Sequence, residues 1–245
     1  MLRLMATRLD ELLAANLGIS KTAVARLVAA GRVTDQARLP ILDRKLSIER
    51  IDPPRTVHVD EESVVLFEDV LVMLHKPRGV VTALRDSRHR TAYDLLVDAP
   101  LFAGLRAIGR LDLDTSGLLL WTTDGGLIQR LTHPKRKVQR TYHAALTAAF
   151  VEPTANFTLE DGHRPEIAAL GVLPRSDVHP ALNVPAEAQV FASISVIGGA
   201  YHEVRRIFAA LGSHVVGLCR TEFGDHTLPA DLPAGEWRLR KLPDA

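Results

Sequence analysis

Residues 109–120 read GRLDLDTSGLLL, and this stretch places chargeable side chains directly before an apolar run. It contains Arg110, Asp112 and Asp114, followed by two hydroxyl residues, and its apolar end continues to Trp121. A short apolar run of this kind is typical of a buried strand. Because a rigid strand can hold reactive groups in the turn beside it, the stretch predicts both a strand and a candidate site.

Three other interpretations of these residues stay open. Asp, Thr and Ser before a strand often bond their own backbone, so Asp114, Thr115 and Ser116 can form a simple turn. Dehalogenase-like phosphatases carry an aspartate nucleophile in a strand followed by Asp-x-Asp, but here Arg110 interrupts the run before Asp112 and the apolar run comes afterwards. A carboxylate pair for glycoside hydrolysis needs a set separation that a sequence does not supply.

The same stretch resembles the signature of the RNA pseudouridine synthases, and further motifs of that family follow in its order. They are LHKPRGV at 74–80, DSRHRTAYDLL at 86–96, TTDGGL at 122–127, LTHPK at 131–135, RTY at 140–142, GGAYHEVRRIFAALG at 198–212 and PAGEWR at 233–238. The resemblance implies an enzyme that breaks the bond between ribose and the uracil nitrogen, turns the base and rejoins it through carbon. Such an isomerisation needs no cofactor, so none is expected.

The resemblance also implies roles for three residues. Asp112 takes the place of the catalytic aspartate, Tyr142 that of the active-site tyrosine, and Arg205 that of the cation beside the carboxylate. A guanidinium favours the charged form of a nearby carboxylate, which can then act as nucleophile or base. An aromatic ring can replace contacts that a base loses when it leaves an RNA stack. Without the motifs, Tyr142 would be a strand aromatic and Arg205 part of a solvated helix face.

The last long motif predicts an amphipathic helix after a Gly-Gly turn. Apolar residues recur at i, i+3, i+4 and i+7, as Val204, Ile207, Phe208 and Leu211, and Gly212 ends the helix. Glu203 stands where the family has glutamine, and its carboxylate is expected to form an ion pair with Arg205 or Arg206. The other departures from the motifs are His75 for asparagine and Arg140 for lysine.

The first 60 residues predict two short helices. Thr7 caps the first, which Gly18 ends, and Ser20 caps the second, which Gly31 ends. With RLD at 8–10, SKT at 20–22 and GRV at 31–33, they resemble the S4 RNA-binding module, although residues 34–40 replace its usual final hairpin. Residues 3–59 carry ten basic side chains against six acidic ones, which favours phosphate contacts.

A second basic stretch lies between residues 125 and 151, which include no Asp or Glu. Alone, this charge would fit a solvated hairpin equally well. With the motifs, we expect RNA contacts from basic residues in both parts of the chain: Lys21, Arg26, Arg32, Lys76, Arg78, Arg110, Lys135, Arg136, Lys137, Arg140 and Arg206.

The chain has 245 residues, of which 47% are hydrophobic, so it can bury a core in one small and one medium domain. We expect a small S4-like α/β domain at 1–60, a linker at 61–68 and a pseudouridine synthase domain at 69–245. Strand-like runs at 70–74, 118–123, 142–146 and 190–197 predict an α+β fold with a mixed, largely antiparallel sheet. Residues 150–185 match no motif and are expected to form a helix and a hairpin that shape substrate choice.

Several function classes are disfavoured. Cys219 is the only cysteine, so neither an intrachain disulfide nor a thiolate cluster forms, and the ten histidines lack ligand spacing, so no metal is expected. No uncharged apolar run is long enough for a bilayer and residues 1–17 are unlike a signal peptide, which predicts a cytoplasmic protein without a membrane. We expect a monomer acting on ribosomal RNA or a subunit assembly intermediate. 16S rRNA is the expected substrate, with 23S rRNA and a noncatalytic RNA-binding role as alternatives.

Overall fold

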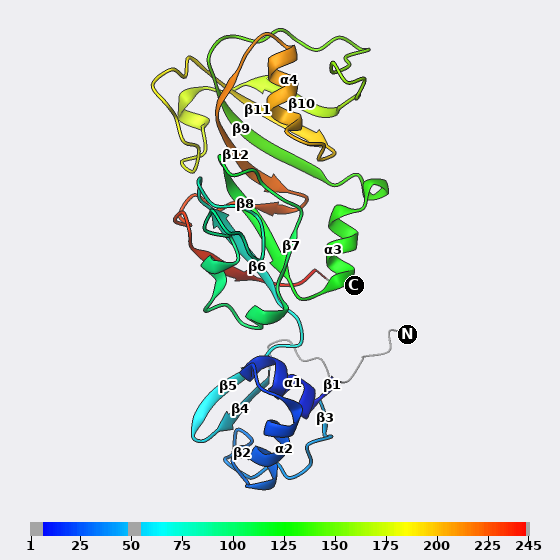
Figure 1. The fold of residues 1–245 in the computed structure, drawn as a ribbon, viewed down its shortest axis with the longest axis vertical. Helices are drawn as coiled ribbons and strands as arrows, with labels where there is room; N and C mark the ends of the chain where they lie inside the picture. Colours follow the sequence, from blue (N-terminus) through cyan, green and yellow to red (C-terminus); the bar gives the residue numbers. More distant parts are fainter. Residues whose placement is uncertain (1–6, 49–54, 244–245) are drawn as a thin grey trace. The chain divides into compact units, whose positions relative to one another are not determined.

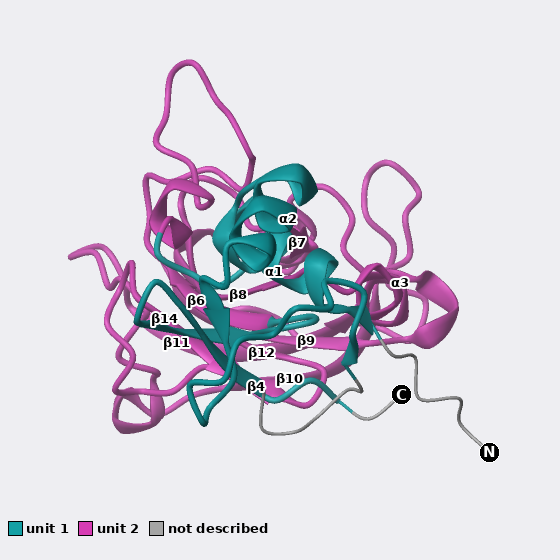
Figure 2. Cartoon of the chain, turned by 90° about the horizontal axis from the view of Figure 1, so that it is seen from below, with its two compact units in different colours: residues 1–70, 98–105, 241–245 teal, residues 71–97, 106–240 magenta. Residues whose placement is uncertain are grey.

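The computed structural model describes residues 7–48 and 55–243, which form two compact units (Figure 2). The N-terminal unit comprises residues 1–70, 98–105 and 241–245, and the larger unit comprises residues 71–97 and 106–240. The sequence Pro53-Pro54-Arg55 is also typical of a linker; its two prolines lie outside the described residues, and Arg55 begins a strand. Each unit has its own hydrophobic core.

The N-terminal unit packs two helices and short strands around one core. Its elements are β1 (Thr7–Arg8), α1 (Leu9–Leu17), α2 (Lys21–Ala29), β2 (Val33–Thr34), β3 (Ser47–Ile48), β4 (Arg55–Val59) and β5 (Glu62–Leu66). Ser20 caps α2 by accepting from Ala23 N at 3.2 Å, and Gly18 ends α1 with φ 64°, as predicted. Thr7 does not cap α1, because it lies in β1 and its hydroxyl donates to Glu68.

The predicted linker at 61–68 differs from the structure. Residues 62–66 form β5, which pairs antiparallel with β4 in a three-stranded sheet of order β2-β4-β5. Leu66 is buried in the core that Leu9, Leu13 and Val24 form beneath this sheet. Of the three acidic residues at 60–62, Asp60 and Glu61 form the turn of a hairpin, both at positive φ, and Glu62 begins β5, so they are not a connection between domains.

A nine-stranded sheet forms the larger unit (Figure 1). Its main path is β10-β11-β9-β12-β8-β6-β14. The bounds are β6 (Leu71–Lys76), β7 (Arg106–Ile108), β8 (Thr115–Thr122), β9 (Gln139–Leu146), β10 (Glu166–Val172), β11 (Val190–Ile197), β12 (Val215–Phe223), β13 (His226–Thr227) and β14 (Trp237–Arg240). The pair β12–β8 is parallel and the other pairs are antiparallel, which confirms the predicted α+β class with its four strand-like runs.

Strand β8 occupies the middle of this sheet, between β6 and β12, and every one of its residues is buried. Its apolar run, Leu118 to Trp121, therefore reads as the continuous core strand that the sequence predicts. Gly117 has φ 110°, and a Cβ there would lie 2.7 Å from the Arg220 backbone nitrogen. The glycine lets β8 and β12 approach closely, directly after the two aspartates.

Two helices flank the sheet. Helix α3 (Gly125–Thr132) is capped by Asp124, whose carboxylate accepts from the backbone nitrogens of Gly126 and Leu127. Helix α4 (Glu203–Ala210) lies over the end of the sheet formed by β9, β10 and β11 (Figure 1). The predicted stripe is confirmed, since Val204, Ile207, Phe208 and Leu211 are buried against that sheet, and Gly212 follows with φ 88°.

Residues 150–185 form no α-helix, contrary to the prediction. They contain β10, which pairs with β11, and one 3-10 turn at Arg175–Asp177. Five prolines at 153, 165, 174, 180 and 185 remove backbone donors at short intervals, so a helix cannot propagate here. No single helix among residues 7–48 and 55–243 is long and apolar enough to cross a membrane, although the bent pair α1–α2 reaches that length and composition jointly.

Candidate active site

Asp112 and Asp114 lie in a tight turn that leads into β8. The turn is closed by Thr115 N, which donates to Asp112 O at 3.1 Å. Its outer side is held by the segment after β6, because Gly79 N donates to Leu113 O at 2.8 Å. The Asp112 side chain is 39% exposed and that of Asp114 is 53% exposed. The backbone of the turn is thus held by hydrogen bonds, and both carboxylate side chains remain partly exposed.

Lys76 lies next to this turn and is completely buried at the end of β6. Its Nζ donates to Thr115 O at 2.7 Å and to Pro77 O at 3.0 Å. Burial lowers its pKa to about 8, against the opposing effect of the nearby charges of Asp114 and Asp112. The predicted RNA contact of Lys76 is wrong, because the buried ammonium bonds the backbone of the carboxylate turn instead.

The two carboxylates have different neighbours on α4. Arg205 Nη2 lies 2.8 Å from Asp114 Oδ2, and its Nη1 donates to Val215 O at 3.1 Å. The residue facing Asp112 is His202, whose Nε2 lies 3.7 Å from Asp112 Oδ2. The guanidinium expected at Asp112 is therefore bonded to Asp114, and an imidazole, which the sequence did not single out for this place, stands beside Asp112.

Glu203 does not pair with Arg205 or Arg206. Its carboxylate is buried at the start of α4, where Oε1 lies 2.7 Å from His163 Nε2 and Oε2 has no hydrogen-bond partner among the described residues. Arg206 instead pairs with Asp161 at 2.5 Å. The predicted pairing is wrong because the first turn of α4 faces the loop before β10. This loop supplies His163 to Glu203 and Asp161 to Arg206.

Tyr142 on β9 lies opposite Arg220 on β12 and packs against the core beneath α4. Arg220 is fully buried, and its Nε donates to Leu118 O at 2.9 Å while its guanidinium lies 4.9 Å from the Phe223 ring centre. Its Nη1 reaches Arg110 O at 3.4 Å and its Nη2 has no partner among the described residues. The sequence analysis missed Arg220, although an arginine inside the apolar run of β12 was a usable signal.

The three predicted catalytic residues come from segments that meet on one face of the larger sheet. Asp112 precedes β8, Tyr142 lies on β9, and Arg205 lies on α4, which covers this face. Register supports this arrangement, since Gly117 and Tyr142 both pair with Arg220, and side chains of paired residues share a face. The arrangement combines two carboxylates, an imidazole, a tyrosine and three cationic groups.

The predicted RNA-binding residues of the larger unit differ in their surroundings. Four are exposed and have no carboxylate partner among the described residues: Arg78, Arg110, Lys135 and Arg136. Lys137 pairs with Glu166 at 2.8 Å. Arg140 is half-buried, donates to Val138 O and Gly198 O, and burial lowers its pKa. Its predicted RNA contact is not supported, because those backbone oxygens and the Phe223 ring already engage it.

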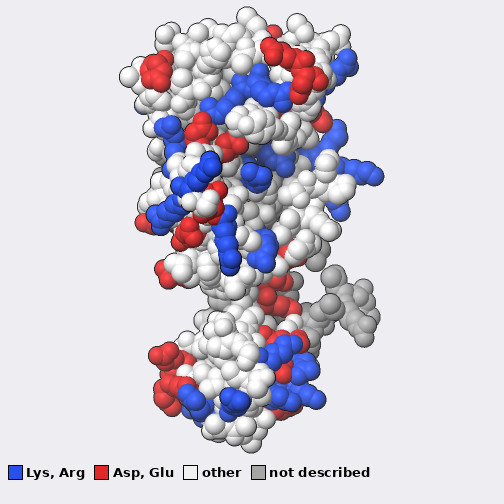
Figure 3. Space-filling model, viewed as in Figure 1, with Lys and Arg blue, Asp and Glu red and all other residues white. Residues whose placement is uncertain are grey.

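On the face shown in Figure 3, basic and acidic side chains are interspersed. In the N-terminal unit, Lys21 pairs with Glu11 at 2.7 Å, and Arg32 donates to Asp60 from two of its guanidinium nitrogens, Nε and Nη2. Arg26 is exposed on α2 and has no carboxylate partner among the described residues. Exposed ion pairs are weak, so an RNA phosphate can displace the carboxylate partners of Lys21 and Arg32. Arg26 can bind phosphate without breaking an ion pair first.

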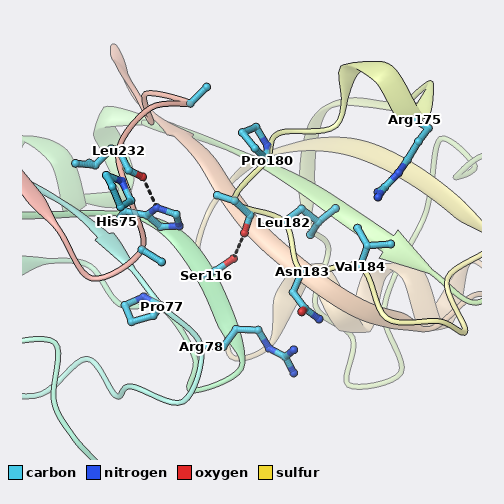
Figure 4. A pocket seen from close by; sticks show the side chains of 14 residues that line it. His75, Pro77, Arg78, Ser116, Arg175, Pro180, Leu182, Asn183, Val184 and Leu232 are labelled. Atoms are coloured by element: carbon cyan, nitrogen blue, oxygen red, sulfur yellow. Dashed lines mark hydrogen bonds between the residues drawn. The ribbon is translucent and has the colours of Figure 1, made fainter.

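The larger unit also has a pocket of about 660 Å³ (Figure 4). His75 and Ser116 line it, and they alternate along their strands with Lys76 and Gly117, which face the carboxylates. Their polar atoms are bonded, His75 to Leu232 O at 2.7 Å and Ser116 to Ala181 O at 2.9 Å. None of the three predicted catalytic residues lines this pocket, so we place the site at the carboxylates. Among the described residues, no group of three or more His, Cys, Asp or Glu could hold a metal ion.

Known proteins resemble the chain along nearly its whole length. Residues 70–210 match the family described as RNA pseudouridylate synthase. Ribosomal small subunit pseudouridine synthase A of Escherichia coli (strain K12) is 35% identical over 94% of this chain and 95% of that protein. The protein of the same name from Haemophilus influenzae is 32% identical over 94% of both chains. A solved pseudouridylate synthase structure is 30% identical, covers 96% of each chain and has a TM-score of 0.52.

Proposed function

Because the chain belongs to the RNA pseudouridylate synthase family, we propose that it isomerises a specific uridine of small-subunit (16S) ribosomal RNA to pseudouridine. Support for the substrate comes from relatives in two organisms that are named ribosomal small subunit pseudouridine synthase A and that align with this chain over 94% of its length. The RNA is free or part of a subunit assembly intermediate, and the enzyme acts as a cytoplasmic monomer. The alternative substrate within the same family is 23S rRNA.

Asp112 is the proposed catalytic residue, and the observation that carries this assignment is the division of neighbours between the two aspartates. Arg205 forms an ion pair with Asp114 at 2.8 Å. Among the described residues, the only ion-pair partner of Asp112 is the imidazole of His202, whose Nε2 lies 3.7 Å from Asp112 Oδ2. A carboxylate that is partly exposed and not bonded by a guanidinium is the one that can reach a nucleotide. Buried Lys76 lies beside the same turn, where its Nζ donates to Thr115 O at 2.7 Å, and a carboxylate in this turn can serve as nucleophile or base.

The neighbouring groups have distinct proposed roles. Arg205, through Asp114 and Val215 O, fixes the carboxylate turn against α4 and supplies positive charge beside it. Tyr142 offers a ring to the uracil once it has left the RNA stack. The reaction breaks the bond from C1′ of ribose to N1 of uracil and forms a bond from C1′ to C5. The hydrogen on C5 leaves as a proton, and N1 takes up a proton in its place. Atoms and electrons balance without a cofactor.

The N-terminal unit is proposed to act as an S4-like module that binds RNA through phosphate contacts. Two helices with Ser20 and Gly18 at their predicted ends support this proposal, as does the exposed, carboxylate-free position of Arg26. Contacts of this kind hold RNA in place without reading its sequence. The catalytic unit would then select the uridine.

A tritium-release assay tests the proposed function. Transcripts of 16S and 23S rRNA are labelled at C5 of uridine and incubated separately with the purified protein. We expect label to be released from the 16S transcript and the labelled position to be converted to pseudouridine. Release from the 23S transcript alone would favour the alternative substrate. RNA binding without release from either transcript would favour a noncatalytic role, and phosphate release from small esters would favour a phosphatase.

A further inference from the structure

Tyr201 presents an aromatic ring to solvent directly before α4. Its side chain belongs to the large hydrophobic residues that stay exposed, and at 77% it is the most exposed of them in the described part of the chain. The ring stacks on His202 with 3.9 Å between ring centres and 14° between ring planes. One face of the tyrosine is therefore covered by the imidazole, while the other face has no aromatic partner among the described residues.

The stack is rigidly attached to the candidate site. His202 adopts φ 49°, a conformation that few non-glycine residues take, and it forms the N-cap of α4. Tyr201 O accepts from Arg206 Nη1 at 3.3 Å, and Arg206 N donates to His202 O at 3.0 Å. The far edge of the imidazole lies 3.7 Å from Asp112 Oδ2. An exposed ring is thus connected to the proposed catalytic carboxylate through one side chain.

We propose that the outer face of Tyr201 is a stacking subsite for a nucleobase that neighbours the reacting uridine in the RNA. The imidazole of His202 lies between the Tyr201 ring and Asp112. A base stacked on the outer face of Tyr201 is therefore too far from Asp112 to belong to the reacting uridine. When a uridine leaves its stack, each neighbouring base loses a partner, and an aromatic face can replace it at about 1–3 kcal/mol. The inference rests on the proposed function, since it needs the uridine at Asp112.

The surroundings favour a nucleobase over an apolar protein partner. Tyr201 is flanked on α4 by Arg205 and Arg206, both of which lie beside carboxylates on a polar surface. An apolar partner would bury these charges, whereas RNA would supply phosphates to them. Because stacking depends on the π-face and not on base-edge hydrogen bonds, the subsite should accept any base.

A two-way comparison of protein and RNA variants tests the subsite. Short RNAs that contain the target uridine are made with an abasic residue at each flanking position in turn, and Kd is measured for the wild type and for Tyr201→Ala. We expect Tyr201→Ala to raise Kd for intact RNA about 5- to 150-fold. One abasic position should weaken binding to the wild type by a similar factor and should have little further effect on Tyr201→Ala. Tyr201→Phe should restore binding, because it keeps the ring.

Val172→Ala is the matched control, since Val172 is 68% exposed on β10 and distant in sequence from the site. The proposal is overturned if Tyr201→Ala binds intact RNA as the wild type does, or if every abasic RNA loses the same factor with both proteins. Unfolding midpoints of all variants show whether a loss comes from α4 instead. Failure of the wild type to release tritium would overturn the proposed function, whereas the Kd comparison would still report on the subsite.

Discussion

Asp112 and Asp114 are separated by one residue, yet their side chains have different ion-pair partners. Arg205 bonds Asp114 at 2.8 Å, and the same guanidinium bonds Val215 O, so this pair connects the carboxylate turn to α4 and to the start of β12. Asp112 is joined to no guanidinium in the described residues and lies beside His202. Position in the motif singled out Asp112 as the candidate, but the pairing of Arg205 depends on side-chain direction, which residue spacing does not determine.

Replacing Arg205 tests its positioning role. We expect Arg205→Gln to lower kcat by about 10²- to 10³-fold, because the charge beside the carboxylate turn is removed. Arg205→Lys should keep part of the activity, since an ammonium can still pair with Asp114. Steady-state tritium release gives kcat and KM separately. If the loss appears in KM with kcat unchanged, Arg205 binds RNA and does not position the turn.

Lys76 gives a prediction for the pH dependence of stability. Its pKa is lowered by burial to about 8 from an ordinary value of 10.5. Below pH 8 the folded protein must hold a buried ammonium, whereas between about 8 and 10.5 the folded state releases a proton that the unfolded state keeps. The free energy of unfolding therefore rises with pH over this window, by about 3 kcal/mol for this group.

Lys76→Met removes that titration. Urea unfolding of wild type and variant at several pH values from 7 to 10.5 measures the difference between them. We expect the wild type to gain stability relative to the variant as pH rises above 8. A difference that stays constant over this range would show that Lys76 is not held at a lowered pKa.

Among the elements, β8 is the one on which the site depends most. Gly117→Ala would place a Cβ 2.7 Å from Arg220 N and closer still to Arg220 O, at φ 110°. We expect a loss of about 2–4 kcal/mol in the free energy of unfolding, because β8 and β12 must separate. Gly171→Ala on β10 is the matched control, since its Cβ would meet nothing within 4 Å. Equal effects in urea unfolding would contradict the close approach at Gly117.

Elements with a strong local signal could be predicted from the sequence. Helix α4 followed from the spacing of Val204, Ile207 and Phe208, and β8 followed from its apolar run. The hairpin strand at residues 62–66 was missed because it begins within a run of three acidic residues, 60–62, that resembles a linker. The two neighbours of Asp112 and Asp114 on α4, and the Glu203–His163 pair, could not be predicted, because they join segments that only the fold brings together.

For the molecule as a whole, the chain combines a catalytic unit with a smaller unit that is proposed to bind RNA. Arg26→Ala should weaken binding to all rRNA fragments alike and reduce the slope of log Kd against log salt by about 1, since one phosphate contact is lost. Arg238→Ala in the larger unit is the control, because that exposed arginine is bonded to Asp231. An unchanged salt slope for Arg26→Ala would mean that α2 does not contact phosphate.

The central claim is that the Asp112 carboxylate performs the chemistry. Asp112→Asn keeps the size of the side chain and removes its charge, so it should leave folding and RNA binding intact. The most direct measurement is tritium release from 16S rRNA labelled at C5 of uridine, made with wild type and Asp112→Asn at equal RNA occupancy. The account predicts release by the wild type and none by the variant; release by the variant at the wild-type rate would contradict it.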